Sequence, residues 1–291
     1  MYAKVNGYRI FFDVEGLQYV SEGAVMRERP VCFALHGGPA GDHTHFLPDL
    51  SPLSEFCQIV YIDDRECGRS DHIDHTTYSI RQNVEDAEAL REQLGLDKIF
   101  ILGHSYGGMK AQYYAAHYPE HLYGAMIVAS AARAADIGPE RRSRNIERFA
   151  GEEDRERFNR LQSDYAEGRI SLMDLSVGLL PLYHGVGKYR GQETIDNFLH
   201  ETYNMDILND PGNDFYSFDL TRDLETVDLP CMIAAGDRDM LCDVEANRYI
   251  ADHILGAEFH ILENTAHDAF SDSAEVLIPL LEDFMKRHFH P

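Results

Sequence analysis

The fold of this 291-residue chain is decided by the stretch Ile99-Phe100-Ile101-Leu102-Gly103-His104-Ser105-Tyr106-Gly107-Gly108. Four apolar residues predict a buried strand, a G-x-S-x-G turn follows, and the run after it is typical of a helix. A strand, a tight turn and a helix in this order form a nucleophile elbow. The glycines let strand and helix approach closely, and the helix N-terminus offers N–H groups and a positive dipole to a developing oxyanion. The stretch therefore predicts Ser105 as a nucleophile. A G-x-S-x-G motif without the flanking strand and helix could be a chance turn.

A serine nucleophile needs a base and an acid, and in this arrangement both follow it in the chain. The apolar run 229–235 predicts a strand that ends in Gly236-Asp237-Arg238-Asp239. Both aspartates lie where ligands bind in an open sheet, just past a strand end. We favour Asp239 as the acid because it stands three residues after the glycine, and we expect Asp237 to brace the loop.

The base is expected at His267, which follows the predicted strand 258–262 closely enough to reach Ser105. The chain has 15 histidines, and most of them are expected to be surface residues. His260 lies inside the predicted strand and reads as structural. His104 stands beside the nucleophile, where packing or lining a pocket is a simpler role than general base.

An oxyanion hole needs a second N–H group besides that of Tyr106. The apolar run 31–35 leads into His36-Gly37-Gly38-Pro39, and glycines in such a loop let the backbone approach a substrate. We therefore predict Gly38 as the second donor. The alternative is an ordinary Gly-Pro turn. The presence of the nucleophile elbow in the same chain argues against this alternative.

Together these motifs resemble those of the proline iminopeptidases, serine peptidases of the α/β-hydrolase fold. That family carries H-G-G-P-G, D-x-x-G-x-G-x-S and G-x-S-x-G-G in this order. The corresponding segments here are 36–40, 63–70 and 103–108, with Ala40 and Glu66 replacing two of the family's glycines. The opening segment 2–7 and the region around His267 are also similar. The resemblance covers roughly two-thirds of the chain, is weak in the middle, and implies release of an N-terminal residue, proline first, from short peptides.

The resemblance also implies carboxylates that bind the free amine of the substrate. One usually stands in an N-E-F context, which corresponds here to Asn213-Asp214-Phe215. Another often follows the catalytic acid directly, and that position is Met240, which has no charge. We therefore expect Asp214 to bind substrate, together with His36 and Gly37 of the glycine loop, with one amine anchor missing.

Two other functions remain open. An esterase, lactonase or amidase acting on a neutral small molecule would keep the same triad, and Met240 favours it. A noncatalytic binding protein on the same fold is disfavoured because such proteins usually lose a triad member, and all three are present. Alanine at Asp237 or Asp239 would show which aspartate serves the triad.

Composition limits the partners. The chain has 26 basic and 50 acidic residues, a net charge of −24, and 44% apolar residues. This charge disfavours nucleic acids and anionic membranes, and it would attract cationic substrates, although a solvated acidic surface explains it equally well. The sequence shows neither a signal peptide nor a membrane span, and its five cysteines lack C-x-x-C spacing, so we expect a cytoplasmic protein. No cofactor or metal motif is present, and the oligomeric state is left open.

The order of the predicted elements places one core domain around an insertion. Apolar runs alternate with helical patterns up to about residue 130, which predicts a mostly parallel central sheet flanked by helices. From 131 to 220 the chain is charge-dense and mainly helical, and it reads as a cap. The sheet resumes near residue 229, so we expect an α/β-hydrolase core from 1–130 and 221–291.

Overall fold

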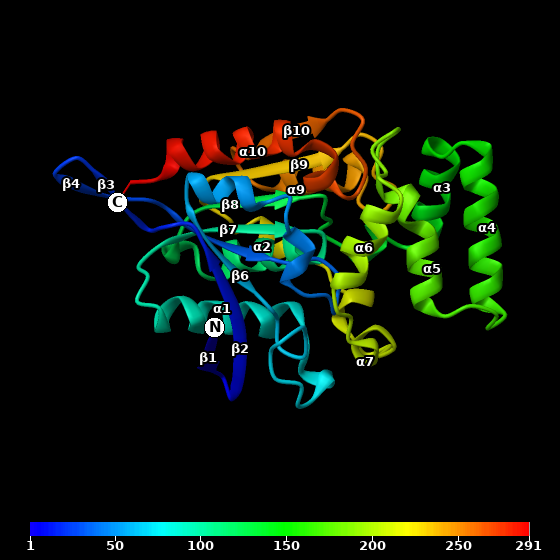
Figure 1. The fold of residues 1–291 in the computed structure, drawn as a ribbon, viewed down its shortest axis with the longest axis horizontal. Helices are drawn as coiled ribbons and strands as arrows, with labels where there is room; N and C mark the ends of the chain where they lie inside the picture. The colour runs from blue at the N-terminus through cyan, green and yellow to red at the C-terminus, as the bar shows by residue number, and fades with distance from the viewer. Residues whose placement is uncertain (291) are drawn as a thin grey trace.

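An eight-stranded sheet forms the centre of the computed structural model, which describes residues 1–290 (Figure 1). Its strands are β1 (Tyr2–Val5), β2 (Tyr8–Glu15), β5 (Val31–Leu35), β6 (Gln58–Ile62), β7 (Ile99–His104), β8 (Leu122–Val128), β9 (Cys231–Gly236) and β10 (Glu258–Leu262). They lie in the order β1-β2-β6-β5-β7-β8-β9-β10. β2 pairs antiparallel with β1 and β6, and every pairing from β6 to β10 is parallel. The predicted mostly parallel α/β fold is confirmed.

The central strands are apolar along their whole length because both faces of the sheet are covered. In β5, Val31, Phe33 and Leu35 pack in one core, while Cys32 and Ala34 pack in the other. Helices α1 (Ile80–Gln93), α2 (Tyr106–His117) and α9 (Val244–His253) contribute to the first core. Helix α10 (Ala269–His288) contributes to the second, and Figure 1 shows α1 and α10 on opposite sides of the sheet.

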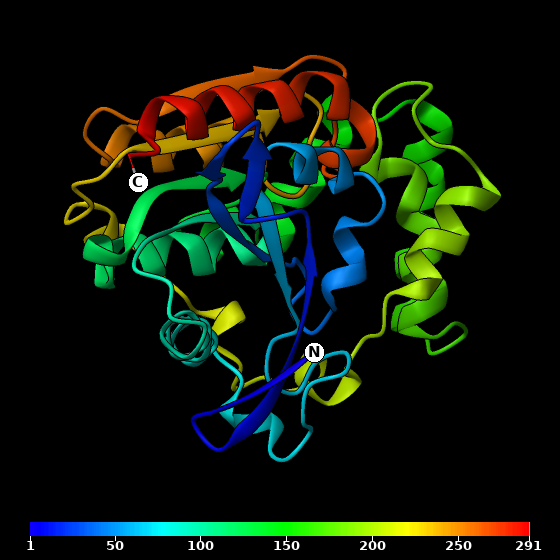
Figure 2. The ribbon, with the colours of Figure 1, turned by 60° about the vertical axis from the view of Figure 1, so that its left-hand side comes forward.

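The segment between β8 and β9 contains the helices α3 (Pro139–Phe149), α4 (Glu152–Ala166), α5 (Leu172–Leu179), α6 (Gln192–His200), α7 (Met205–Leu208) and α8 (Thr221–Leu224). Figures 1 and 2 show α3 to α6 gathered beyond one end of the sheet. Ile146, Leu175, Leu179 and Leu182 form their apolar cluster, and Met240 of the core joins it. We propose residues 131–220 as the cap.

A small hairpin was not predicted. Strands β3 (Tyr19–Glu22) and β4 (Val25–Glu28) pair antiparallel and project away from the main sheet (Figure 1). Their side chains are mostly exposed, so the hairpin lacks the apolar run that marks a buried strand. Within residues 1–290, no helix combines the length and apolar character needed to cross a membrane.

Candidate active site

Ser105 occupies a backbone conformation that few non-glycine residues adopt. Its φ is 55° and its ψ is −118°, between the end of β7 and the first residue of α2. Gly103 and Gly107 must be glycines because the surrounding backbone leaves no room for a Cβ atom. A Cβ on Gly107 would lie 1.9 Å from the Leu35 carbonyl oxygen, and one on Gly103 would lie 2.1 Å from the Gly107 oxygen. This crowding holds the turn, and strain of this kind is typical of functional sites.

Ser105, His267 and Asp239 form a hydrogen-bonded chain. His267 Nε2 lies 3.0 Å from Ser105 Oγ, and His267 Nδ1 lies 2.9 Å from Asp239 Oδ2. Asp239 is fully buried, and its other carboxylate oxygen accepts the backbone N–H groups of Leu241 and Cys242 at 2.8 and 3.0 Å. The acid is therefore fixed on both oxygens, and it orients the imidazole ring with Nε2 towards Ser105.

Asp237 has a different environment. Its Oδ1 accepts the backbone N–H of Thr265 at 3.2 Å, and its own N–H donates to the Leu262 oxygen at 3.0 Å. These contacts tie the loop after β9 to the loop after β10, which carries His267. Asp237 therefore braces the two loops, whereas Asp239 is the carboxylate in contact with the histidine.

The two predicted oxyanion donors lie at the same end of the sheet. Tyr106 is the first residue of α2, and Gly38 follows β5 and lines the cavity at Ser105. Gly38 has a φ of 124°, a conformation that favours glycine. Within residues 1–290, neither N–H group donates to a protein acceptor. Both are available to an oxygen of a bound molecule.

His36 and Gly37 support this loop from beneath. His36 is fully buried, its Nδ1–H donates to the Gly37 oxygen at 2.8 Å, and its Nε2 accepts the Asp64 N–H at 3.3 Å. Burial lowers the pKa of His36, so the ring is neutral. Asp64 in turn forms a buried ion pair with Lys110. Neither His36 nor Gly37 lines the cavity, so the expected substrate contact is not seen at either residue. Both residues belong instead to the loop that carries Gly38.

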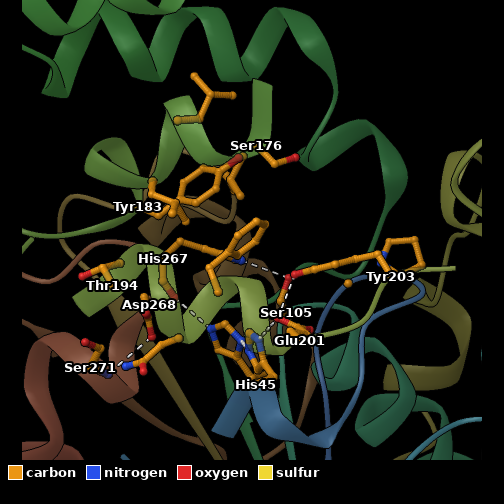
Figure 3. A pocket seen from close by; sticks show the side chains of 18 of the residues that line it. His45, Ser105, Ser176, Tyr183, Thr194, Glu201, Tyr203, His267, Asp268 and Ser271 are labelled. Carbon is orange, nitrogen blue, oxygen red and sulfur yellow. Dashed lines mark hydrogen bonds and ion pairs between the residues drawn. The ribbon is translucent and has the colours of Figure 1, made fainter. Parts of the chain in front are cut away.

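A cavity of about 370 Å³ lies between Ser105 and the segment 131–220. Most of its wall is apolar and comes from that segment, including Leu172, Leu175, Leu179, Phe198 and Phe215. Figure 3 shows the side chains of Ser105, His267, Glu201 and Tyr203 around the same cavity. Its size and its largely apolar surface are typical of a small-molecule site, and charged side chains such as Asp49, Arg190 and Asp268 also line it.

Sequence comparison adds to this geometry. The pattern of the alpha/beta hydrolase fold matches residues 30–274. The chain belongs to the α/β-hydrolase fold family. It is therefore a hydrolase by family, and its parallel sheet and elbow are those of the fold.

The curated relatives of this hydrolase include proline iminopeptidases. That of Saccharolobus solfataricus is 27% identical over 98% of this chain and 91% of its own length. The proline iminopeptidase of Lactobacillus helveticus is 24% identical over 97% of this chain and 96% of its own length. The resemblance to this family is confirmed.

Solved structures with the same fold include a proline iminopeptidase of Mycobacterium smegmatis, with a TM-score of 0.77 and 18% identity over 99% of this chain and 98% of that one. Another is Est816, an N-acyl homoserine lactone degrading enzyme, with a TM-score of 0.73 and 21% identity over 98% and 100%. At these identities the likeness concerns the fold alone.

Asp214 lies away from the cavity wall of this hydrolase. Its Oδ2 accepts the backbone N–H of Ile80 at 2.7 Å, and its Oδ1 accepts the Tyr106 hydroxyl at 3.3 Å. Burial raises the pKa of Asp214, although these hydrogen bonds oppose the shift. Its neighbour Phe215 lines the cavity instead. The structure thus places the expected amine anchor in a contact between the segment 131–220 and the start of α1.

Glu201 is the acidic residue that the sequence interpretation missed. It lines the cavity just after α6, and its side chain is only 5% exposed. Oε2 accepts the Tyr203 hydroxyl at 2.8 Å and lies 3.5 Å from His45 Nδ1, whereas Oε1 has no hydrogen-bond partner. A buried carboxylate oxygen without a donor is unusual. No motif in the sequence marks this position.

Two histidines connect Glu201 to the base. His45 Nε2 lies 2.6 Å from His104 Nδ1, and the two rings stack at a centroid distance of 4.8 Å. His104 Nε2 donates to the backbone oxygen of His267 at 2.8 Å. Burial, and then the nearby His45 and His267, lower the pKa of His104 well below its ordinary value. A neutral His104 with its proton on Nε2 accepts from His45, so both nitrogens of His104 have a partner.

Two clusters in the structure have donor sets that could hold a metal: Asp239, Cys242 and His267, and Asp42, His43 and Asp63. In the first, Asp239 already accepts from His267. In the second, Asp63 accepts from His43 Nδ1 at 2.6 Å, and Asp42 accepts the N–H groups of Thr44 and Thr202, both at 2.9 Å. These carboxylates have protein donors, so hydrogen bonding alone accounts for both clusters.

Proposed function

We propose that this hydrolase is a serine aminopeptidase that releases an N-terminal residue, proline first, from short peptides. The observation that carries the proposal is a hydrogen-bonded Ser105–His267–Asp239 chain at a cavity that is also lined by a buried carboxylate, Glu201. The first group attacks a carbonyl carbon, and the second binds a cation. The similarity to proline iminopeptidases supports the same substrate class.

In the proposed reaction, Ser105 Oγ attacks the carbonyl carbon of the first residue while His267 Nε2 takes the hydroxyl proton. The oxyanion binds the N–H groups of Tyr106 and Gly38, each worth about 3 kcal/mol in such sites. His267 then gives its proton to the leaving nitrogen, and the peptide C–N bond breaks. Water attacks the acyl-enzyme by the same route in reverse, which frees Ser105 and the N-terminal amino acid. Asp239 keeps the proton-bearing Nδ1 of His267 directed away from the serine.

Glu201 replaces Asp214 in our proposal as the group that binds the substrate's amine. The Glu201 carboxylate lines the cavity, and a charge-assisted hydrogen bond from a protonated amine contributes about 1.5–3 kcal/mol. The net charge of −24 favours the approach of a cationic substrate.

An esterase, lactonase or amidase acting on a neutral molecule is the second candidate. The apolar part of the wall and the uncharged Met240 favour it, because apolar side chains offer no partner to a charged substrate. The two candidates share the triad and differ in whether the substrate's amine contributes to binding. A noncatalytic role is not proposed because the triad is complete.

The test compares three substrates: a prolyl arylamide, its N-acetylated form and a short-chain aryl ester, with Ser105→Ala as the blank. We expect the free-amine arylamide to be hydrolysed preferentially, and Glu201→Gln to lower its kcat/KM by about ten- to hundredfold. Ester turnover that is insensitive to both the amine and Glu201→Gln would overturn the peptidase proposal in favour of the second candidate. Asp214→Asn is the matched control, for which we expect a smaller loss.

A further inference from the structure

The cavity contains an arginine without a partner. Two arginines line it, Arg142 and Arg190. Arg190 is paired, with Glu193 at 2.8 Å and Asp49 at 3.7 Å. Arg142 forms no ion pair with any residue in the range 1–290 that the structure describes, and its Nε is buried without a hydrogen-bond partner. One cavity is thus lined by a guanidinium that has no protein counter-ion and by the carboxylate of Glu201.

Two adjacent arginines of helix α3, Arg141 and Arg142, lie in different surroundings. Arg141 reaches the core domain and pairs with Asp243 and, at 3.4 Å, with Asp136. Successive residues of a helix point about 100° apart, and Arg142 faces the cavity instead. Burial raises the pKa of the Tyr183 hydroxyl, and the positive charge of Arg142 opposes that shift. The guanidinium therefore acts within the cavity, close to a residue that lies against His267.

Leaving this arginine unpaired is costly. A partly buried charge without a counter-ion loses hydration and gains nothing in return. The chain has 50 acidic and only 26 basic residues, so an acidic partner would be easy to supply. A guanidinium presents a planar set of donors that matches a carboxylate with two parallel hydrogen bonds. The missing partner is therefore best supplied by an anionic group of a bound molecule.

We propose that Arg142 binds the carboxylate of the leaving residue, so that the preferred substrate is a dipeptide with both termini free. This inference rests on the proposed aminopeptidase function and adds the other end of the substrate. Glu201 binds the amine, Ser105 attacks the carbonyl between the two ends, and the leaving amino acid keeps the carboxylate that Arg142 holds. Arg142 and Glu201 then each contact a group of opposite charge on one zwitterionic molecule.

The kinetic experiment compares Pro-Ala, Pro-Ala-NH₂ and Pro-Ala-Ala on the wild-type protein and on Arg142→Gln, Arg142→Lys and Arg144→Gln. Arg144 lies on the same helix, is 61% exposed and has a single weak contact at 3.8 Å, so it is the matched control. We expect Pro-Ala to be favoured over its amide and over the tripeptide, whose carboxylate lies about 3.5 Å further along the chain. Arg142→Gln should lower kcat/KM for Pro-Ala about ten- to hundredfold more than for Pro-Ala-NH₂. Arg142→Lys should restore part of the difference.

A binding experiment separates this inference from the proposed function. Titration calorimetry on Ser105→Ala and on Ser105→Ala/Arg142→Gln measures the affinity for Pro-Ala and Pro-Ala-NH₂ without turnover. Tighter binding of the free dipeptide that depends on Arg142 supports the carboxylate site even if arylamides are not hydrolysed. Equal affinity for the acid and the amide, equal loss of both in the arginine variant, or binding of neither at millimolar concentration would overturn it. Preference for a free amine in the arylamide assay would then still stand.

Discussion

His104 Nε2 donates a hydrogen bond of 2.8 Å to the backbone oxygen of His267, although the two residues are 163 positions apart in the chain. The ring of His104 also lies 5.0 Å from the His267 ring, and its other nitrogen accepts from His45. The residue next to the nucleophile therefore holds the loop that carries the proposed base. This relationship makes His104 a positioning residue in our interpretation.

Removing this contact should affect turnover more than binding. We expect His104→Ala to lower kcat by about ten- to hundredfold, because small displacements of a base cost factors of this size, and to leave KM nearly unchanged. His104→Gln, whose amide can still donate to the His267 oxygen, should recover part of the loss. Steady-state kinetics on a prolyl arylamide measures both. A change confined to KM, or a kcat no lower than that of the control His260→Gln, would contradict the positioning role.

The pairing of His45 with Glu201 should make stability depend on pH. Burial lowers the pKa of His45, but the carboxylates of Glu201, Asp268 and Asp42 together outweigh burial, so the net shift is upward. A raised folded-state pKa means that the protonated form is favoured in the folded protein. This contribution is complete below the unfolded value of about 6.5 and is lost as the pH rises through the folded value.

We therefore expect His45→Gln to lower the Tm more at pH 6 than at pH 8.5. Each kcal/mol lost corresponds to roughly 2–4 °C in a chain of this size. Thermal unfolding followed by circular dichroism at the two pH values gives the comparison. His260→Gln, on a half-exposed residue of β10, serves as the control. An equal Tm loss at both pH values would show that His45 contributes by packing alone.

The two aspartates after β9 should differ sharply when they are replaced. Asp239→Ala removes the carboxylate that orients His267, and comparable changes in serine hydrolases lower kcat by about 10⁴-fold. Asp237→Ala loses only a contact with the Thr265 N–H, so we expect a loss of tenfold or less. Turnover of the prolyl arylamide by each variant decides between them. Abolished activity in Asp237→Ala together with retained activity in Asp239→Ala would reverse our assignment.

Gly107 should tolerate no side chain. An alanine Cβ would lie 1.9 Å from the Leu35 oxygen, which is backbone and can move only if β5 and α2 separate. We expect Gly107→Ala to destabilise the fold by at least about 3 kcal/mol, the upper end for overpacked cores. Denaturant unfolding measures this, with Gly151→Ala as the control because nothing lies within 4 Å of a Cβ there. Equal midpoints for the two variants would mean that the elbow can relax.

Local sequence carries much of the information about this fold. The apolar runs predicted β5 and β10 to the residue, and the helical spacing from 79 to 94 predicted α1, which spans Ile80–Gln93. A strand buried on both faces, such as β5, and an amphipathic helix leave patterns within a few consecutive residues. The glycines of the elbow are equally local, because a turn this tight excludes a Cβ whatever the rest of the chain does.

The polar ends of the cavity depend on tertiary structure. Asp214 had the expected sequence context, yet its carboxylate is occupied by the Ile80 N–H, 134 positions away. Glu201 and Arg142 stand among many charged residues of the cap, and nothing in their neighbours distinguishes them from solvated side chains. They become distinct only in the folded protein, where both line the cavity and each has one buried atom without a hydrogen-bond partner. By itself, the sequence determined the fold through short-range apolar and glycine patterns. The tertiary structure decided which charged side chains line the cavity, because burial and pairing of charges are set by residues far apart in the chain.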